Sequence, residues 1–100
     1  MKILTNENKD FIYEEPFVLV DFWAEWCNPC RAMLPILESI EKELPDLNMC
    51  KYNVEDSNIT EELSIQSIPT LILFMNGTEI KRWIGLQNKT NLLNQLKELI

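Results

Sequence analysis

Residues 17–23, Phe-Val-Leu-Val-Asp-Phe-Trp, form a nearly unbroken apolar run, which limits the possible folds more than any other feature. A strand with one face in water alternates apolar and polar side chains, whereas a strand covered on both faces is apolar throughout. The run is therefore typical of a strand in the middle of an α/β sheet. Only Asp21 interrupts it. Its carboxyl is either desolvated, with a raised pKa, or near enough to the strand end to reach solvent.

Helical and strand-like segments alternate around this run. A helix is predicted from Asn28 to about Leu44, where apolar side chains recur on one stripe. Pro35 lies inside this helix and is expected to bend it, and Pro45 ends it. The other elements predicted before residue 64 are a strand near Lys2–Leu4, a helix capped by Asn6 and running to about Glu15, a strand over Leu47–Val54 and a short helix from Asn58 to about Leu63.

The dipeptide Asn76-Gly77 separates two further strand-like segments, Thr70–Met75 and Thr78–Trp83. It is a strong hairpin signal, because a type I′ turn needs positive φ at both central residues. Thr90 is predicted to cap a final amphipathic helix. The early strand–helix–strand units predict parallel pairing, and the hairpin adds antiparallel strands. We predict one α/β domain over residues 1–100, with a mixed central β-sheet of about five strands flanked by about four helices.

Composition and charge exclude several functions. The net charge is −7 and no basic stripe exists, which argues against a nucleic-acid partner. The chain has no His, which excludes Cys–His and Ser–His–Asp catalysis and most zinc sites. It also has no apolar run of membrane-spanning length, and the amino terminus lacks the pattern of a signal peptide. We expect a cytoplasmic monomer with no membrane partner.

Cys27 and Cys30 follow the buried strand directly, at the start of the predicted helix. Side chains at i and i+3 share a helix face, which brings two sulfurs within disulfide reach. The helix N-terminus favours a thiolate at Cys27 and lowers its pKa, and Pro29 is tolerated in the first turn. Zinc would need two more ligands, and haem attachment would need His in place of Arg31. We predict a redox-active pair without a metal or other cofactor.

Residues 20–30, Val-Asp-Phe-Trp-Ala-Glu-Trp-Cys-Asn-Pro-Cys, resemble the active-site signature of the thioredoxin family. Asn28 stands where that family usually has Gly. Further matches lie at Pro35, Lys51, Ser67-Ile68-Pro69-Thr70, Phe74-Met75-Asn76-Gly77 and Ile84-Gly85. The resemblance covers essentially the whole chain without large gaps. It implies a thioredoxin fold and the reduction of protein disulfides.

The resemblance also implies a role for each central residue. Cys27 is the exposed nucleophile, and Cys30 is the buried resolving thiol. Asp21 lies beneath the cysteines and exchanges protons with Cys30. Lys51 is its neighbour and modulates its pKa, although a surface lysine with a buried stem fits this residue equally well. The implied partners are a thioredoxin reductase, which restores the dithiol, and disulfide-containing client proteins.

A second set of positions is implied to face the client. Pro69 matches the family's cis-proline, although trans is the commoner isomer. The backbone at Ile68 then offers strand-like hydrogen bonds to an extended client segment. Asn28 is implied to tune the redox potential, with an unspecified sign. The implied substrate-binding residues are Trp26, Pro29, Ile68, Pro69, Ile84 and Gly85, for which ordinary core or turn roles stay open, above all at Ile84.

Cys50 lies in a predicted central strand and is interpreted as an inert buried side chain. Two other function classes stay open. The first is a non-catalytic binding module, which would not need both cysteines, the buried Asp and the proline loop together. The second is a neighbouring redox class, either a glutaredoxin with a glutathione site or a secreted oxidase with a signal peptide. Asn28 also leaves open whether the chain is a general reductant or serves a single enzyme.

Overall fold

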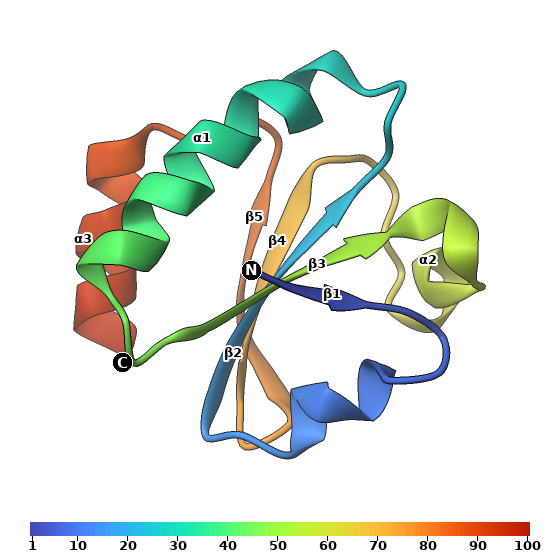
Figure 1. Ribbon diagram of the computed structural model, residues 1–100, viewed down its shortest axis with the longest axis horizontal. Helices are drawn as coiled ribbons and strands as arrows, with labels where there is room; N and C mark the ends of the chain where they lie inside the picture. Colours follow the sequence, from blue (N-terminus) through green and yellow to red (C-terminus); the bar gives the residue numbers. More distant parts are fainter.

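The computed structural model describes residues 1–100, which form one five-stranded sheet with helices packed against it (Figure 1). In chain order the elements are β1 (Lys2–Leu4), the 3-10 helix η1 (Lys9–Tyr13), β2 (Phe17–Trp23), α1 (Asn28–Glu43), β3 (Asn48–Asn53), the 3-10 helix η2 (Val54–Asp56), α2 (Ile59–Glu62), β4 (Thr70–Met75), β5 (Thr78–Ile84) and α3 (Lys89–Leu99). The strand order is β1-β3-β2-β4-β5. β3 is parallel to β1 and β2, whereas β4 is antiparallel to β2 and β5. The predicted mixed sheet of five strands is confirmed.

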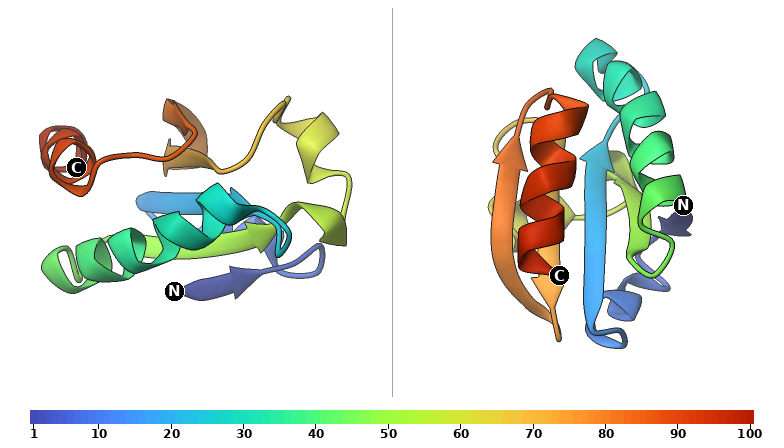
Figure 2. Two further views of the ribbon diagram at one scale, coloured as in Figure 1. Left: turned by 90° about the horizontal axis from the view of Figure 1, so that it is seen from above. Right: turned by 90° about the vertical axis from the view of Figure 1, so that its left-hand side faces the viewer.

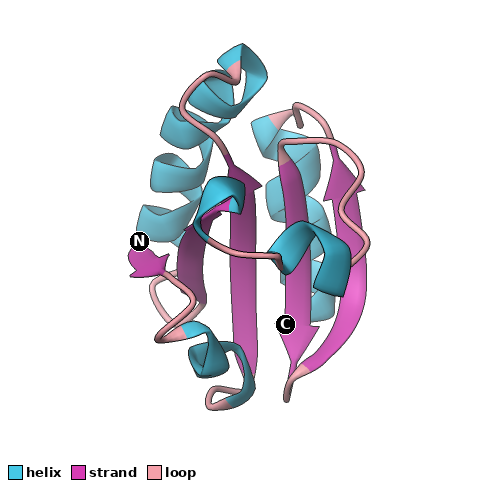
Figure 3. Ribbon diagram, turned by 90° about the vertical axis from the view of Figure 1, so that its right-hand side faces the viewer, coloured by secondary structure: helices cyan, strands magenta, loops and turns pink.

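The central strand β2 is covered on both faces, as its apolar sequence predicts. Leu19 belongs to the apolar cluster that α1 and α3 close on one face. Val20 and Phe22 belong to the cluster that η1 and α2 close on the other face. Figures 2 and 3 show the sheet between these two layers of helices. Because side chains alternate along a strand, Asp21 shares the face of Leu19 and lies on the α1 side.

Three α-helices flank the sheet rather than about four, because the first predicted helix is the short 3-10 helix η1. It begins at Lys9, so Asn6 is not its cap. The Asn8 side chain accepts a hydrogen bond from the Thr5 N–H at 2.6 Å and donates one to the Ile3 carbonyl at 3.1 Å. These two bonds hold the segment before Lys9 in a turn, which leaves too few residues for a longer helix.

The cap of the last helix also differs from the prediction. Asn88 precedes α3, and its side-chain oxygen accepts the Asn91 N–H at 3.1 Å. Thr90 therefore lies inside the first turn and is not the cap. The longer helix α1 continues through the exposed Pro35, as predicted. None of the helices has the length and apolar content needed to cross a membrane.

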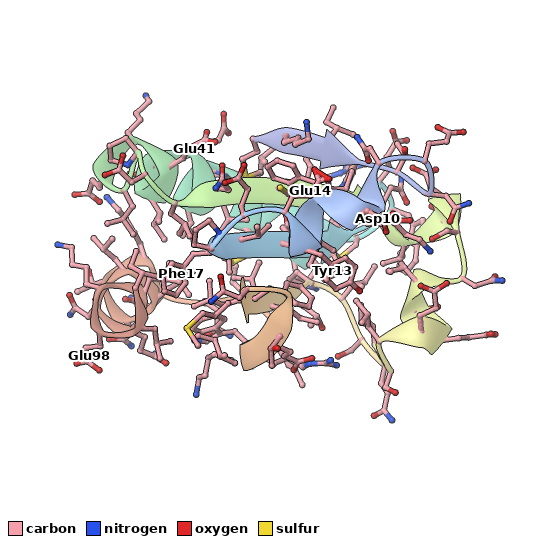
Figure 4. The ribbon with its side chains drawn as sticks, turned by 90° about the horizontal axis from the view of Figure 1, so that it is seen from below. Asp10, Tyr13, Glu14, Phe17, Glu41 and Glu98 are labelled. Carbon is pink, nitrogen blue, oxygen red and sulfur yellow. A yellow bond between two sulfur atoms is a disulfide. The ribbon has the colours of Figure 1, made fainter.

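The predicted hairpin is confirmed at Asn76-Gly77, where φ is +50° and +82°. Its tip lies beside η1, and a Cβ atom added at Gly77 would lie 2.7 Å from Cδ1 of Tyr13. Glycine is thus required here both by the backbone and by the close approach of Tyr13. Figure 4 shows this end of the molecule, where β2 starts at Phe17. The cysteines lie beyond the other end of the same strand.

Candidate functional site

The functional site lies at the carboxyl end of β2, where the chain turns into α1 (Figure 1). Cys27 is the N-cap residue of α1, and Cys30 lies in its first turn. The two residues form a disulfide with their Cα atoms 5.2 Å apart. The carboxyl edge of the parallel strands thus carries the redox pair that the i, i+3 spacing predicts.

The local field around the Cys27 sulfur favours negative charge. The Cys30 N–H donates to Cys27 Sγ at 3.2 Å, in the position of an N-cap hydrogen bond. The helix N-terminus adds its partial positive charge. The Ile68 carbonyl oxygen lies 3.8 Å from the same sulfur, and its partial negative charge opposes only part of this effect because it is farther away than the amide. After reduction, a thiolate at Cys27 would therefore be stabilised by an amide that is already in place.

Burial does not distinguish the two cysteines in this disulfide form. Cys27 is 5% exposed and Cys30 is 4% exposed. The expectation of an exposed Cys27 is therefore wrong for the oxidised protein. Its sulfur is covered by neighbours that lie far away in sequence, since Val54 and Ile68 pack against the small cluster formed by Ala24 and the two cysteines.

Asp21 is buried, with 3% exposure, and its Oδ1 atom has no hydrogen-bond partner. Desolvation raises the pKa of its carboxyl from 3.8 to about 7, and the charge of Lys51 partly opposes this rise. The alternative of a solvated strand-end carboxyl is thereby excluded. A carboxyl with a pKa near neutrality can take up and release protons under ordinary conditions.

Lys51 is the neighbour of Asp21 that the resemblance implies. The two residues are register partners in β3 and β2, and both lie on the α1 side of the sheet. The Lys51 ammonium lies 4.8 Å from the centre of the Trp23 ring. The ammonium does not come within 4.0 Å of the Asp21 carboxyl, so the two form no ion pair. Lys51 therefore lowers the pKa of Asp21 by a longer-range attraction.

The loop before β4 faces the disulfide through its backbone. The Ile68–Pro69 peptide bond is cis, which confirms the isomer implied by the resemblance. Thr70 Oγ1 donates to the Ser67 carbonyl at 2.7 Å, and the Gly85 N–H donates to the Pro69 carbonyl at 2.8 Å. The first bond closes the turn that leads into β4, and the second ties this turn to the end of β5.

Two apolar side chains of the predicted substrate-binding set reach the surface. Trp26 is 67% exposed and Ile84 is 64% exposed, so neither is a core residue. Leu86, which is not among the predicted site residues, is 55% exposed and follows directly after Gly85. An apolar residue in an otherwise polar segment between a strand and a helix is the signal that could have identified it.

Several further predicted positions are also placed by the fold. Asn28 and Pro29 are exposed in the first turn of α1, whereas Pro69 is buried. Ile68 and Gly85 are half-buried. Cys50 is 1% exposed, and burial raises the pKa of its thiol to about 11. This supports its interpretation as an inert apolar side chain, because a thiol with so high a pKa supplies almost no thiolate at neutral pH.

Comparisons with known proteins agree with this geometry. A family model described as Thioredoxin matches residues 1–98. Thioredoxin from Chlamydia pneumoniae is 48% identical over an alignment of 99 residues that covers 95% of this chain and 97% of that protein. The structure of Plasmodium falciparum thioredoxin has a TM-score of 0.91 at 31% identity and covers 100% of both chains.

Mitochondrial thioredoxin 3 from Saccharomyces cerevisiae, in its oxidized form, has a TM-score of 0.86 at 32% identity. The match covers 98% of this chain and 94% of the yeast chain. The predicted fold and the predicted disulfide oxidoreductase activity are confirmed. The chain belongs to the thioredoxin family.

Proposed function

We propose that this protein reduces client disulfides with Cys27 as the nucleophile, Cys30 as the resolving thiol and Asp21 as the proton acceptor. The observation that carries the assignment is the position of Cys27 Sγ at the N-cap of α1, where it accepts the Cys30 N–H at 3.2 Å. A thiolate gains more from this site than a neutral thiol does, so Cys27 is the sulfur that the site prepares for attack.

The first step is attack of the Cys27 thiolate on one sulfur of the client disulfide. A new sulfur–sulfur bond forms between Cys27 and the client, and the other client sulfur leaves as a thiolate that takes a proton from water. In the second step Cys30 gives its proton to Asp21 and attacks Cys27 Sγ. The mixed disulfide breaks, the second client sulfur leaves as a thiolate that takes a proton from water, and two electrons have passed to the client.

Asp21 suits the second step because of its pKa. With a pKa of about 7, its carboxylate is a stronger base than an ordinary Asp, whose pKa is 3.8. It is also partly ionised at neutral pH and can therefore accept a proton there. Its burial on the α1 side of β2 keeps it apart from bulk water. Lys51 limits the rise of this pKa and modulates the proton transfer.

The client segment is proposed to bind across the surface around Cys27. Trp26 precedes Cys27 and Pro29 lies between the two cysteines, whereas Ile84, Gly85 and Leu86 come from the end of β5 and the turn after it. The exposed apolar side chains of this group favour an extended segment with apolar neighbours beside its cystine. Ile68 and the cis Pro69 offer backbone groups between them.

The partners proposed are a thioredoxin reductase, which returns two electrons to the Cys27–Cys30 disulfide, and proteins that carry accessible disulfides. The family assignment supports both in general form. The cytoplasmic location, the monomeric state and the absence of a cofactor stay predictions.

Trapping tests the nucleophile directly. Reduced Cys30→Ser protein mixed with oxidised insulin should accumulate a mixed disulfide, because Cys27 can attack but nothing resolves the product. The Cys27→Ser variant should trap almost nothing. Iodoacetamide at neutral pH should alkylate Cys27 first in the reduced, folded parent. Faster alkylation of Cys30 or Cys50 would overturn the assignment.

A further inference from the structure

Side-chain packing does little to hold the turn between β5 and α3 in place. Ile84 and Leu86 are exposed, so their side chains do not anchor it. Gly85 has φ +85°, and no atom outside Gly85 and its two chain neighbours lies within 4 Å of the place where its Cβ would be. A glycine in open space has wide conformational freedom. The position of this turn therefore depends on hydrogen bonds.

Gln87 makes most of these bonds. Its side-chain amide donates to the Ile84 carbonyl and to the Gly85 carbonyl, each at 3.2 Å. Both N–H bonds of one amide group are thus used on two successive carbonyls. Its backbone N–H donates to Met33 Sδ at 3.3 Å. Thioether sulfur is a weak acceptor, so the side-chain bonds are the stronger anchors.

The anchored turn is tied to the redox pair from two directions. Met33 is buried in α1, three residues after Cys30. The Gly85 N–H bonds the Pro69 carbonyl at 2.8 Å, and the Ile68 carbonyl lies 3.8 Å from Cys27 Sγ. Gln87 therefore closes a network that holds Gly85 and Leu86 at a set place beside the cysteines.

We propose that Gln87 is a positioning residue, whose side-chain amide fixes the Ile84–Leu86 turn so that a protein client meets a preformed apolar surface. This inference rests on the function proposed above. A preformed turn does not have to be ordered when the client binds, which lowers the entropic cost of association. Gln87 hydrogen-bonds neither cysteine in this network. Its replacement should therefore slow the reduction only of clients that contact the turn.

Two substitutions remove the donors while keeping the size of the side chain. Gln87→Met has no polar hydrogen, and Gln87→Glu presents carboxylate oxygens, which accept but do not donate. Asn94→Asp is the matched control, because it makes the same amide-to-carboxylate change on an exposed residue of α3. Each reduced protein is mixed with insulin, or with the small aryl disulfide 5,5′-dithiobis(2-nitrobenzoate), and its oxidation is followed by tryptophan fluorescence.

The second-order rate constant with insulin should fall at least about fivefold in both Gln87 variants, because each of the two lost hydrogen bonds corresponds to about that factor at average net strength. The rate constant with the small disulfide and the reduction potential should match the parent, since neither depends on the turn. Amide exchange at Gly85 should become faster by a similar factor. The Asn94→Asp control should match the parent throughout.

Unchanged insulin kinetics in both Gln87 variants would overturn the proposal. An equal loss with insulin and with the small disulfide would also overturn it, because Gln87 would then act through the thiols. Failure of the parent itself to reduce insulin would count against the proposed function instead. In that event the exchange rate at Gly85 still decides whether Gln87 holds the turn.

Discussion

Replacing Asp21 with Asn should make the protein more stable at neutral and alkaline pH while slowing its chemistry. The carboxyl is 3% exposed, its Oδ1 atom has no partner, and its pKa is about 7 instead of 3.8. Ionisation is therefore less favourable in the folded protein than in the unfolded chain. The Asn side chain has a similar shape, stays neutral at every pH and cannot serve as a base.

The direction of the pH dependence follows from linkage. Below pH 3.8 the acid is neutral in both states and brings no ionic penalty. As the pH rises, the unfolded chain releases its proton first, so the free energy of unfolding falls until the pH passes the folded pKa of about 7. A rise of roughly 3 pKa units corresponds to about 4 kcal/mol at pH 8 and above.

Urea unfolding of the oxidised parent and the Asp21→Asn variant between pH 4 and 9 measures this difference. Urea is preferred because guanidinium salts would screen the charge of Lys51. The free energy of unfolding of the variant minus that of the parent should rise by about 4 kcal/mol from its value at acid pH and level off above pH 7. All other titrating groups are shared, so their contributions cancel.

In the Asp21→Asn variant the buried amide adds a contribution to the free energy of unfolding that does not change with pH. The Asp21→Ala variant checks this contribution, because Ala has no polar side-chain group. Mixed-disulfide resolution, measured by rapid mixing of reduced protein with insulin, should be slower in both variants. A stability difference that stays flat with pH, or resolution as fast as in the parent, would refute the reasoning.

Two further substitutions test local features of the fold. Asn28→Gly changes an exposed residue in the first turn of α1, next to Cys27, and should shift the reduction potential or the turnover with a reductase while leaving the thermal midpoint nearly unchanged; equal potentials and equal rates would show that this position is neutral. Gly77→Ala should cost about 1–3 kcal/mol in urea unfolding, because φ is +82° and the new Cβ would lie 2.7 Å from Tyr13 Cδ1. Disulfide reduction should continue at the parent rate, since the hairpin lies at the other end of the sheet, and an unchanged unfolding midpoint would contradict the expected clash.

Elements whose structure depends on residues close together in the chain could be predicted from the sequence. The apolar run in β2 demands cover on both faces, whichever helices supply it. Asn76-Gly77 allows positive φ at two successive residues, so the hairpin tip was predictable. Cys27 and Cys30 come within disulfide distance because one helical turn separates them.

Helix boundaries were less predictable, because competing side chains decide them. Asn6, Asn8, Asn88 and Thr90 are all residue types that cap helices, and sequence alone does not rank them. In the folded chain the Asn8 side chain bonds within the turn after β1, and the Asn88 side chain caps α3.

The environment of the redox pair was decided by the tertiary structure. The sequence by itself determined a buried central strand, an Asp within that strand and a cysteine pair at a helix start. Its local patterns did not determine that Asp21 pairs in register with Lys51, which only the family resemblance implied, that Ile68 covers Cys27, or that Gln87 bonds the turn at Gly85. The first two contacts join residues that lie 30 and 41 positions apart. The Gln87 bonds are short in sequence, but they act on the site only through Pro69 and Met33. Such contacts depend on strand register and on the packing of separate elements, which no local pattern of residues encodes.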